Sequence, residues 1–514
     1  MYSRLSSAAV CGIDAFIVDV ETHLENHLPN FVTVGLPDSA VRESRERVMA
    51  AVKNSEFPFP QKKVTINLAP ADVRKEGSAF DLPIALGILV ACDIIAEENT
   101  GQILFIGELA LDGALRPVHG VLSIAVEAAK QGFARLLLPA DNAAEAALVP
   151  GIDVIPITTL QQAVQYLNGD SSIDPLRINI SDVFRVDDDA GKPDIADVKG
   201  QESVKRALEI AAAGGHNLIM VGPPGSGKTM LAKRIPTILP PLTLDESLET
   251  TKIHSVTGLL PNGQALLTQR PFRAPHHTIS DAALVGGGVG IVRAGEISMA
   301  NHGVLFLDEL PEFARNVLEV LRQPLEEKRI SISRTKMTIE FPCNFMLVCS
   351  MNPCPCGNFG NPAQQCSCTP QQIQRYMARI SGPLLDRIDL HVDVAGVQYR
   401  ELSTARVGET SGVIRARVIK ARHVQTERYM LAPGVYKNAD MGPAELEQYC
   451  VLDDASQQLI KTAMVKLGLS ARAYDRILKV SRTIADLAGS STIHAAHISE
   501  AIQYRNLDRQ YWNA

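Results

Sequence analysis

The stretch that decides the fold of this chain is Gly222-Pro223-Pro224-Gly225-Ser226-Gly227-Lys228-Thr229. It matches the phosphate-binding pattern G-x-x-x-x-G-K-[ST] without a gap. The apolar run 216–221 before it predicts a buried strand, and residues 230–234 predict the start of a helix. In that setting, glycines let backbone amides close around an anion, and the helix N-terminus adds its positive dipole end. The whole stretch is expected to bind ATP, with Lys228 on the β- and γ-phosphates and the Thr229 hydroxyl on Mg²⁺.

A second motif, at 303–309, places an apolar strand before two carboxylates, Asp308 and Glu309. Ligand sites in open α/β sheets lie beyond the carboxyl ends of the strands, so both side chains are expected beside the phosphate loop. Asp308 would hold Mg²⁺ through water, and Glu309 would orient and deprotonate the attacking water. Asn352 follows another apolar run, 345–350, and can contact the γ-phosphate or that water. The alternative is an asparagine that starts a turn before the next proline.

Two arginines are candidates for a catalytic role. Arg387 follows a short predicted helix, and Arg472 opens a helix in the last part of the chain. Either could act as an arginine finger, which stabilises charge on the transferring phosphoryl group. The alternative is a solvated charge or a surface ion pair, and the spacing alone favours that alternative.

The composition is that of a soluble globular protein, with 46% hydrophobic and 21% charged residues in 514. The net charge of −7 argues against a wholly basic nucleic-acid binder but allows a local basic channel. No run reaches ~18 uninterrupted apolar residues, and the first residues lack the hydrophobic region of a secretory signal peptide. We therefore expect a cytoplasmic protein without a membrane span.

Hydrophobic patterning divides the chain into four parts. Residues 1–168 predict an α/β domain, 169–193 a polar acidic linker, 194–396 the nucleotide-binding core and 397–514 a helical region. The fold class is therefore α/β. Strands of the first part are predicted at 16–20, 31–34, 64–68, 104–108 and 135–138. Helices of the last part are predicted at 412–430, 443–450, 455–467, 471–488 and 493–506.

Four of the nine cysteines, Cys354, Cys356, Cys366 and Cys368, form a C-x-C…C-x-C pattern with nine residues between the pairs. Four thiolates that lie close together can complete a tetrahedral Zn²⁺ site. The intervening loop is rich in glycine and proline and has little apolar surface to order it, so a metal would supply the missing stabilisation. The alternative is a disordered loop with free thiols; we favour zinc.

These motifs resemble a known family. The phosphate loop, Leu305–Glu309, Ser350–Pro353 and Leu384–Asp389 are similar to an AAA+ ATPase of the magnesium-chelatase-like branch. More closely, the chain resembles the YifB/ComM family, on the segments Val34–Asp38, Phe272–Ser280, Pro353–Gly357 and Ser481–Leu487. The resemblance covers essentially the whole chain.

The resemblance implies a role for each candidate. Lys228, Thr229, Asp308 and Glu309 would be the Walker residues, Asn352 the sensor 1 residue, Arg387 a finger acting in trans, and Arg472 the sensor 2 arginine. Since a finger on one subunit must reach a neighbour's ATP, it also implies a ring, a homo-hexamer with nucleotide bound. The implied function is an ATP-driven DNA helicase that promotes branch migration on single-stranded or branched DNA during natural transformation. Two alternatives stay open: a chelatase-type motor subunit that remodels a protein partner, and a regulatory or scaffold ATPase.

The N-terminal part resembles the Lon-protease-like domain of this family, which has the ribosomal-S5-domain-2-like fold. Ser78 lies near the register of the Lon nucleophile, but the segment 119–122 has an apolar residue in place of the catalytic lysine. A serine nucleophile needs a base. We therefore expect no peptidase activity, and expect Ser78 to cap the helix predicted at 81–91.

Two segments are candidates for DNA contact in a central pore. The segment 326–339 alternates as strand–turn–strand, and its turn presents Arg334 and Lys336. The resemblance identifies it as the hairpin before sensor 1, and 284–293 as the helix-2 insert. Contacts from such loops to the DNA backbone would be independent of sequence and sensitive to salt. The alternative for the hairpin is a solvated edge whose charges prevent aggregation.

Two further patterns are expected to be structural. The predicted helix 412–430 carries five basic residues, for which we expect a solvated face. His276 and His277 have no metal partner at a recognisable spacing, so we interpret them as structural or inter-subunit residues.

Overall fold

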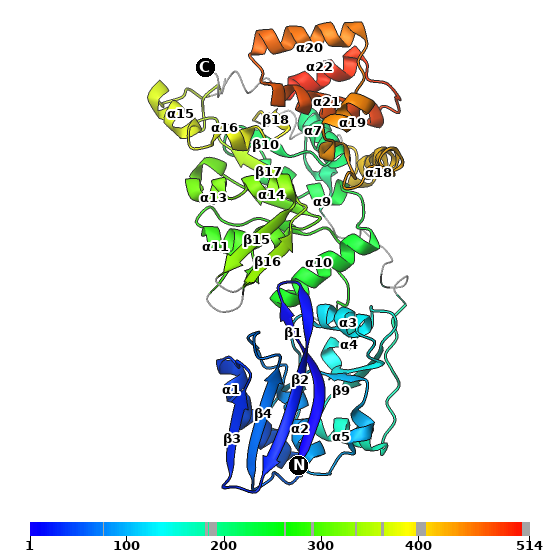
Figure 1. Cartoon of the computed structure of the whole chain (residues 1–514). Helices are drawn as coiled ribbons and strands as arrows, with labels where there is room; N and C mark the ends of the chain where they lie inside the picture. The colour runs from blue at the N-terminus through cyan, green and yellow to red at the C-terminus, as the bar shows by residue number, and fades with distance from the viewer. Residues whose placement is uncertain are drawn as a thin grey trace.

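The computed structural model describes residues 1–75, 77–179, 183, 193–261, 264–288, 292–334, 337–360, 364–396 and 408–505. Residues 180–182 and 184–192 of the predicted linker therefore lie outside the described residues. Figure 1 shows an elongated molecule, with the N-terminal domain at one end, the core in the middle and the helical region at the other end. Within the described ranges, no helix has the length and apolar character needed to cross a membrane.

The N-terminal domain is built on a seven-stranded sheet of order β3-β4-β2-β1-β5-β8-β9. Its strands are β1 (Tyr2–Cys11), β2 (Asp14–Glu25), β3 (Asn30–Val34), β4 (Lys63–Ala69), β5 (Ile103–Phe105), β8 (Arg135–Pro139) and β9 (Asp153–Ile157), with a short ribbon of β6 (Glu108–Leu109) and β7 (Leu115–Arg116). Its helices are α1 (Ser39–Asn54), α2 (Asp81–Ala91), α3 (Val121–Lys130), α4 (Ala143–Ala146) and α5 (Leu160–Asn168). Every residue of α2 is buried, as its apolar sequence requires. The patterning did not predict β1 and β9.

The predicted cap at Ser78 is wrong. The N-cap residue of α2 is Phe80, which makes no side-chain cap hydrogen bond. The chain makes one more turn before the helix, in which the Asp81 N–H donates to the Ser78 carbonyl at 3.2 Å. The Ser78 hydroxyl instead donates to the Glu108 carboxylate.

The core is a parallel five-stranded sheet of order β11-β14-β17-β10-β18. Its strands are β10 (Leu218–Val221), β11 (Phe272–Arg273), β14 (Val304–Leu307), β17 (Met346–Met351) and β18 (Leu390–Asp393). Two small ribbons accompany it, β12 (Gly286–Gly287) with β13 (Arg293–Ala294), and β15 (Arg329–Arg334) with β16 (Met337–Pro342). Its helices are α7 (Glu202–Gly214), α8 (Lys228–Ala232), α9 (Ile235–Ile238), α10 (Leu244–Thr257), α11 (Asp281–Val285), α12 (Glu296–Met299), α13 (Arg315–Glu319), α14 (Arg322–Glu327), α15 (Pro370–Met377) and α16 (Gly382–Leu385). Because all five strands are parallel, their carboxyl ends meet at one edge.

All five helices predicted for the C-terminal region are present: α18 (Ser411–Arg428), α19 (Pro443–Tyr449), α20 (Asp454–Leu467), α21 (Ala471–Leu487) and α22 (Ala495–Gln503). The predicted solvated face of α18 is wrong for three of its arginines. Arg417 pairs with Glu209 and Glu409, Arg422 donates to the Ala212 carbonyl at 3.0 Å, and Arg428 pairs with Asp486. These arginines attach α18 to α7 and α21 instead of facing water.

Asp486 lies in the segment Ser481–Leu487, which resembles the family. Its buried carboxylate accepts hydrogen bonds from Arg428 Nη1 at 2.8 Å, Arg482 Nε at 3.0 Å and Asn438 Nδ2 at 2.8 Å. Arg482 is itself only 2% exposed. One carboxylate therefore balances two largely buried guanidinium groups.

Replacing Asp486 with alanine is expected to lower the free energy of unfolding by ~3–5 kcal/mol, because two partly buried cations lose their counter-charge. Chemical denaturation of the full chain measures the change. Asp475→Ala, at an exposed position of the same helix, is the control and should shift stability by less than ~0.5 kcal/mol. Equal stability of the two variants would contradict the prediction.

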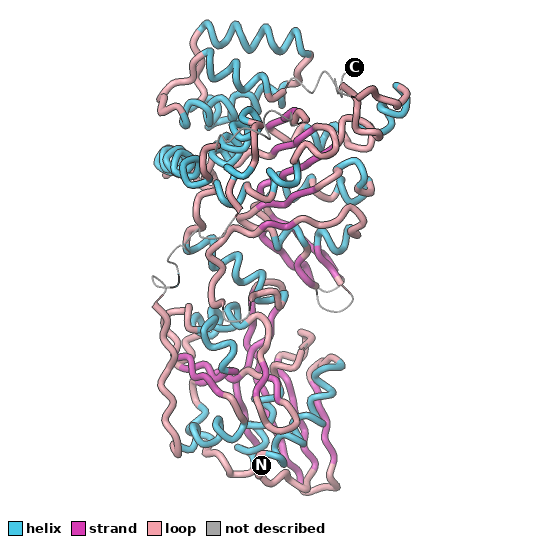
Figure 2. Tube along the Cα trace, turned by 180° about the vertical axis from the view of Figure 1, so that it is seen from behind, coloured by secondary structure: helices cyan, strands magenta, loops and turns pink. Residues whose placement is uncertain are grey.

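Two contacts join the N-terminal domain to the core. Near α10, the Gly120 N–H donates to the Ser255 carbonyl at 3.2 Å, and Leu122 packs in an apolar cluster with Leu266. The second contact lies at the tip of the β1–β2 hairpin, which both views show reaching toward the core (Figures 1 and 2). At this tip a Cβ on Gly12 would lie 2.5 Å from Ile339 Cγ2 of β16, so the approach needs glycine.

Candidate nucleotide site

The phosphate loop lies between β10 and α8, as predicted. Gly225 and Gly227 have φ of +75° and +88°, the left-handed conformation that glycine adopts without strain. The Lys228 ammonium lies inside the loop, where it donates to the Gly222 and Pro223 carbonyls at 2.7 and 2.8 Å. Burial lowers the pKa of Lys228. In this structure the Lys228 ammonium, which the sequence pattern predicts to bind phosphates, is hydrogen-bonded to carbonyls of the loop itself.

Asp308 lies beside this loop, at the carboxyl end of β14. Its Oδ2 accepts a hydrogen bond from Thr229 Oγ1 at 2.7 Å, and its Oδ1 accepts one from the Ser350 hydroxyl. Sequence reasoning missed Ser350. The strand pairing could have found it, because Leu307 pairs with Cys349 and the following residues, Asp308 and Ser350, are therefore neighbours.

Asn352 also reaches the phosphate loop. Its Oδ1 accepts from Lys228 Nζ at 3.3 Å, which favours the sensor interpretation over a residue that only starts a turn. The carboxyl edge of the sheet therefore gathers Lys228, Thr229, Asp308 and Asn352.

Glu309 follows Asp308 with φ of +56°, an uncommon conformation for a residue with a side chain. Its side chain is 55% exposed, and its Oε2 lies 3.8 Å from His277 Nδ1. Arg273 of β11 pairs with Leu305 of β14. His277 and Glu309 each follow four residues after this pair, so they lie at the same level along the strands. Sequence reasoning placed no contact between His277 and Glu309, since the register of β11 is not visible from its own short sequence.

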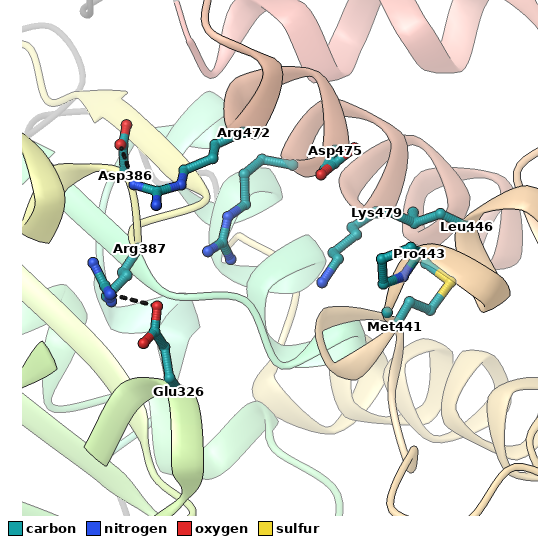
Figure 3. Close-up of a pocket in the computed structure, with 11 residues that line it drawn as sticks. Glu326, Asp386, Arg387, Met441, Pro443, Leu446, Arg472, Asp475 and Lys479 are labelled. Atoms are coloured by element: carbon teal, nitrogen blue, oxygen red, sulfur yellow. Dashed lines mark hydrogen bonds and ion pairs between the residues drawn. The ribbon is translucent and has the colours of Figure 1, made fainter. Parts of the chain in front are cut away.

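Arg387 and Arg472 line a cavity of about 200 Å³ that is separate from the phosphate loop (Figure 3). Arg387 pairs with Glu326 of α14 and donates to the Pro383 carbonyl at 2.5 Å. Arg472 Nη1 donates to Asp386 Oδ2 at 3.2 Å. Two more cations, Arg476 and Lys479, line the same cavity.

This cavity and the phosphate loop belong to opposite edges of the core sheet. In the parallel pair of β10 and β18, Leu218 pairs with Leu390 and Val221 with Asp393. The phosphate loop follows Val221, whereas Arg387 precedes Leu390. A four-residue strand spans about 13 Å, so Arg387 is on the far side of the sheet from the phosphate loop of its own chain.

Comparison with known proteins shows the family to which the chain belongs. Three family models match: subunit ChlI of Mg-chelatase over residues 20–142, magnesium chelatase subunit ChlI over 194–402, and the subunit ChlI C-terminal model over 408–505. The chain is 48% identical over 514 residues to the competence protein ComM of Haemophilus influenzae, covering 99% of this chain and 97% of the relative. The chain belongs to the YifB/ComM family.

Membership of the YifB/ComM family makes the chain a homologue of ComM and a magnesium-chelatase-like AAA+ ATPase. It is also 44% identical over 504 residues to YifB of Salmonella typhimurium, covering 98% of this chain and 96% of the relative. A more distant match, 26% identical over 175 residues, is the magnesium-chelatase 38 kDa subunit of Rhodobacter capsulatus, covering 30% of this chain and 49% of that subunit. The expected fold class is confirmed, with an α/β N-terminal domain, a parallel AAA-like sheet and a helical C-terminal region.

The residues at the carboxyl edge fit ATP and Mg²⁺, which the ATPase family implies. The hydroxyl of Thr229 and the carboxylate of Asp308 are the oxygen ligands that Mg²⁺ prefers. Their side chains already lie within hydrogen-bond distance of one another, so one ion could contact both.

The four clustered cysteines fit a zinc ion. Their Sγ atoms all lie within 4.8 Å of one another. The pairs 354–356, 356–366 and 354–366 are separated by 3.4, 3.5 and 3.7 Å. Four sulfurs at about 2.3 Å from a central ion would stand about 3.8 Å apart. The loop thus has the shape of the tetrahedral site that the spacing predicted.

The predicted hairpin before Asn352 is present as β15 and β16, paired from Arg329 with Pro342 to Arg334 with Met337. Of its two candidate DNA contacts, Arg334 is the last residue of β15, and Lys336 lies outside the described residues.

Proposed function

We propose that this chain is an ATP-driven DNA motor that works as a cytoplasmic homo-hexameric ring and promotes branch migration during natural transformation. The observation that carries the proposal is the separation of the catalytic residues across the core sheet. One edge has the phosphate loop, Asp308, Glu309 and Asn352, and the other has Arg387 and Arg472. A complete site then needs the carboxyl edge of one copy and the arginine edge of the next.

In such a site the residues divide the work. Lys228 and the loop amides hold the phosphates, and Thr229 and Asp308 hold Mg²⁺, which neutralises charge on the phosphate oxygens. Glu309 takes a proton from the attacking water, while Asn352 orients it. Arg387 of the neighbouring copy stabilises the charge that develops on the γ-phosphoryl group.

DNA as the substrate is supported by two facts. The relative that is 48% identical over almost the whole chain is named a competence protein. The β15–β16 hairpin forms a two-stranded ribbon separate from the core sheet, and the sequence predicts Arg334 and Lys336 at its turn. Cations at such a turn bind the phosphate backbone of any sequence.

The test is ATP turnover with no DNA and with single-stranded, duplex and branched DNA. Stimulation by DNA is expected, and it should be lost in the double variant Arg334→Ala, Lys336→Ala. The slope of the logarithm of the DNA-binding constant against the logarithm of salt concentration should also decrease in magnitude by about one for each removed phosphate contact. Lys461→Ala, at an exposed position of α20, is the control and should keep the stimulation.

Turnover that no DNA changes would contradict the proposal. It would support the second candidate, a chelatase-type motor that remodels a protein partner. The observation favouring that candidate is the match of all three parts of the chain to models of the chelatase subunit.

We also propose that Cys354, Cys356, Cys366 and Cys368 hold one Zn²⁺ as thiolates. The support is the distance between their sulfurs, which agrees with a tetrahedral site. The ion has no free position in such a site, so its role is structural rather than catalytic.

A further inference from the structure

The cysteine loop lies directly against the phosphate loop. Gly357, one residue after Cys356, has φ of +81°, and a Cβ there would lie 2.5 Å from Pro224 Cδ and 2.7 Å from Pro224 Cγ. Contacts below 3.0 Å are closer than carbon atoms allow, so only glycine fits. The backbone at Gly357 therefore packs directly against Pro224 of the phosphate loop, and we call this piece of backbone the wall.

The same loop is tied to Asn352 at both of its ends. Cys354 comes two residues after Asn352 along the chain. Beyond Cys368, Thr369 caps α15, and its Oγ1 accepts from the Gln372 N–H at 3.3 Å. Tyr376 of α15 then returns to the start of the loop, where it packs in the same apolar cluster as Met351, the residue before Asn352. The described residues on both sides of the cysteines therefore lie beside Asn352.

The cysteine sulfurs accept backbone hydrogen bonds inside this loop. Cys354 is buried, whereas the side chains of Cys356, Cys366 and Cys368 are half-buried. The Phe359 N–H donates to Cys354 Sγ at 3.3 Å, the Cys356 N–H to Cys368 Sγ at 3.4 Å, and the Gly357 N–H to the Cys354 carbonyl at 2.9 Å. The position of the wall at Gly357 therefore depends on where the four sulfurs are held.

We propose that zinc on these four cysteines is a clamp for the ATP site, fixing Pro224 and Asn352 at once, so that nucleotide affinity depends on the metal. The proposal rests on the zinc site proposed above. When the sulfurs are held at one centre, the wall behind Pro224 is rigid and the phosphate loop keeps its curvature. When the metal is lost, the wall and Asn352 relax together, and the amides that bind phosphate lose their alignment.

The first test changes the wall and leaves the sulfurs in place. Gly357→Ala is expected to weaken binding of a fluorescent ATP analogue about tenfold, since displacing a binding group by ~1 Å costs on the order of 10- to 100-fold. The chain should still carry zinc. Gly360→Ala is the matched control, because Gly360 also has a positive φ, +76°, in the same loop, but a Cβ there meets nothing within 4 Å. It should bind nucleotide like the wild type.

The second test removes the metal. Metal analysis of the full chain should give one zinc per chain, and Cys366→Ser with Cys368→Ser should abolish it and weaken nucleotide binding about tenfold or more. Cys92→Ser is the control for loss of a thiol outside the loop. If the double variant does not fold, as thermal unfolding would show, zinc is released from the wild type with a mercurial reagent and the mercury is then removed from the cysteine sulfurs with an excess of dithiothreitol. Nucleotide binding is measured before and after zinc is added back.

Three results would overturn the clamp, and they separate it from the proposed zinc site. Zinc present in the wild type, with nucleotide binding unchanged in both variants, would overturn the clamp alone. Weak nucleotide binding by Gly357→Ala together with normal nucleotide binding after zinc removal would support the role of the wall at Gly357 and overturn the role of the metal. No zinc in the wild type would overturn both the site and the clamp.

Discussion

Glu309→Gln is expected to lower the rate of ATP hydrolysis by ~10²–10⁴-fold while nucleotide binding is retained. Glutamine has the size of glutamate and keeps a hydrogen-bond acceptor for the attacking water, but it cannot take up a proton. Binding should survive because Lys228, Thr229 and Asp308 make their contacts without Glu309. Phosphate release measures the rate, and a fluorescent ATP analogue measures the affinity.

The control for this substitution is Glu312→Gln. Glu312 lies three residues further along the same segment, where it pairs with Arg379 at the surface. Removal of that pair should change the hydrolysis rate by less than twofold, because surface ion pairs contribute ~0–1 kcal/mol. A Glu309→Gln chain that hydrolyses ATP at the wild-type rate would show that another group is the base.

Arg387→Ala is expected to lower hydrolysis by ~10³–10⁵-fold, the range found for arginine fingers. The geometry makes this expectation specific: Arg387 lies on the far side of the sheet from the phosphate loop of its own chain, so in the proposed ring its loss is expected to act on the neighbouring copy. Each variant chain still has an intact phosphate loop. Nucleotide binding to dilute chains, measured under conditions where rings do not form, should therefore stay near the wild-type value.

A mixing experiment distinguishes action on a neighbour from local damage. Rings of Arg387→Ala alone and of Glu309→Gln alone should both be inactive. In mixed rings, an intact Glu309 from the first variant meets an intact Arg387 from the second, so hydrolysis should reappear. Arg379→Ala, which removes an exposed arginine outside the cavity around Arg387, is the control for lost charge. Failure of the mixture to recover activity would contradict a finger acting in trans.

The nucleotide site could be predicted from sequence because its parts are local. The phosphate loop, the pair Asp308 and Glu309, and Asn352 each follow an apolar run, and parallel strands place such ends together without further information. The same reasoning found the five helices of the C-terminal region. It missed β1, whose small residues alternate only weakly, and it missed Ser350, whose role depends on the neighbouring strand.

Other features could not be predicted because they depend on tertiary contacts. The basic residues of α18 gave the pattern of a solvated face, yet Arg417 and Arg428 find carboxylates on α7 and α21. Ser78 has the right residue type for a cap, but the chain turns once more before α2 begins. The contact of Gly357 with Pro224 joins segments that are more than a hundred residues apart, and neither sequence alone indicates the other.

The seating of the N-terminal domain on the core has a consequence for ionic strength. At the hairpin tip, Cys11 and Ile13 pack with Ile339 and Phe341, so this contact consists of apolar side chains. Salt screens charges and does not weaken apolar burial. A high-salt wash is therefore expected to remove polyanions from the turn of the β15–β16 ribbon and leave the domain in place against Ile339 and Phe341. Purification in concentrated salt should yield a chain free of nucleic acid with its two parts still joined.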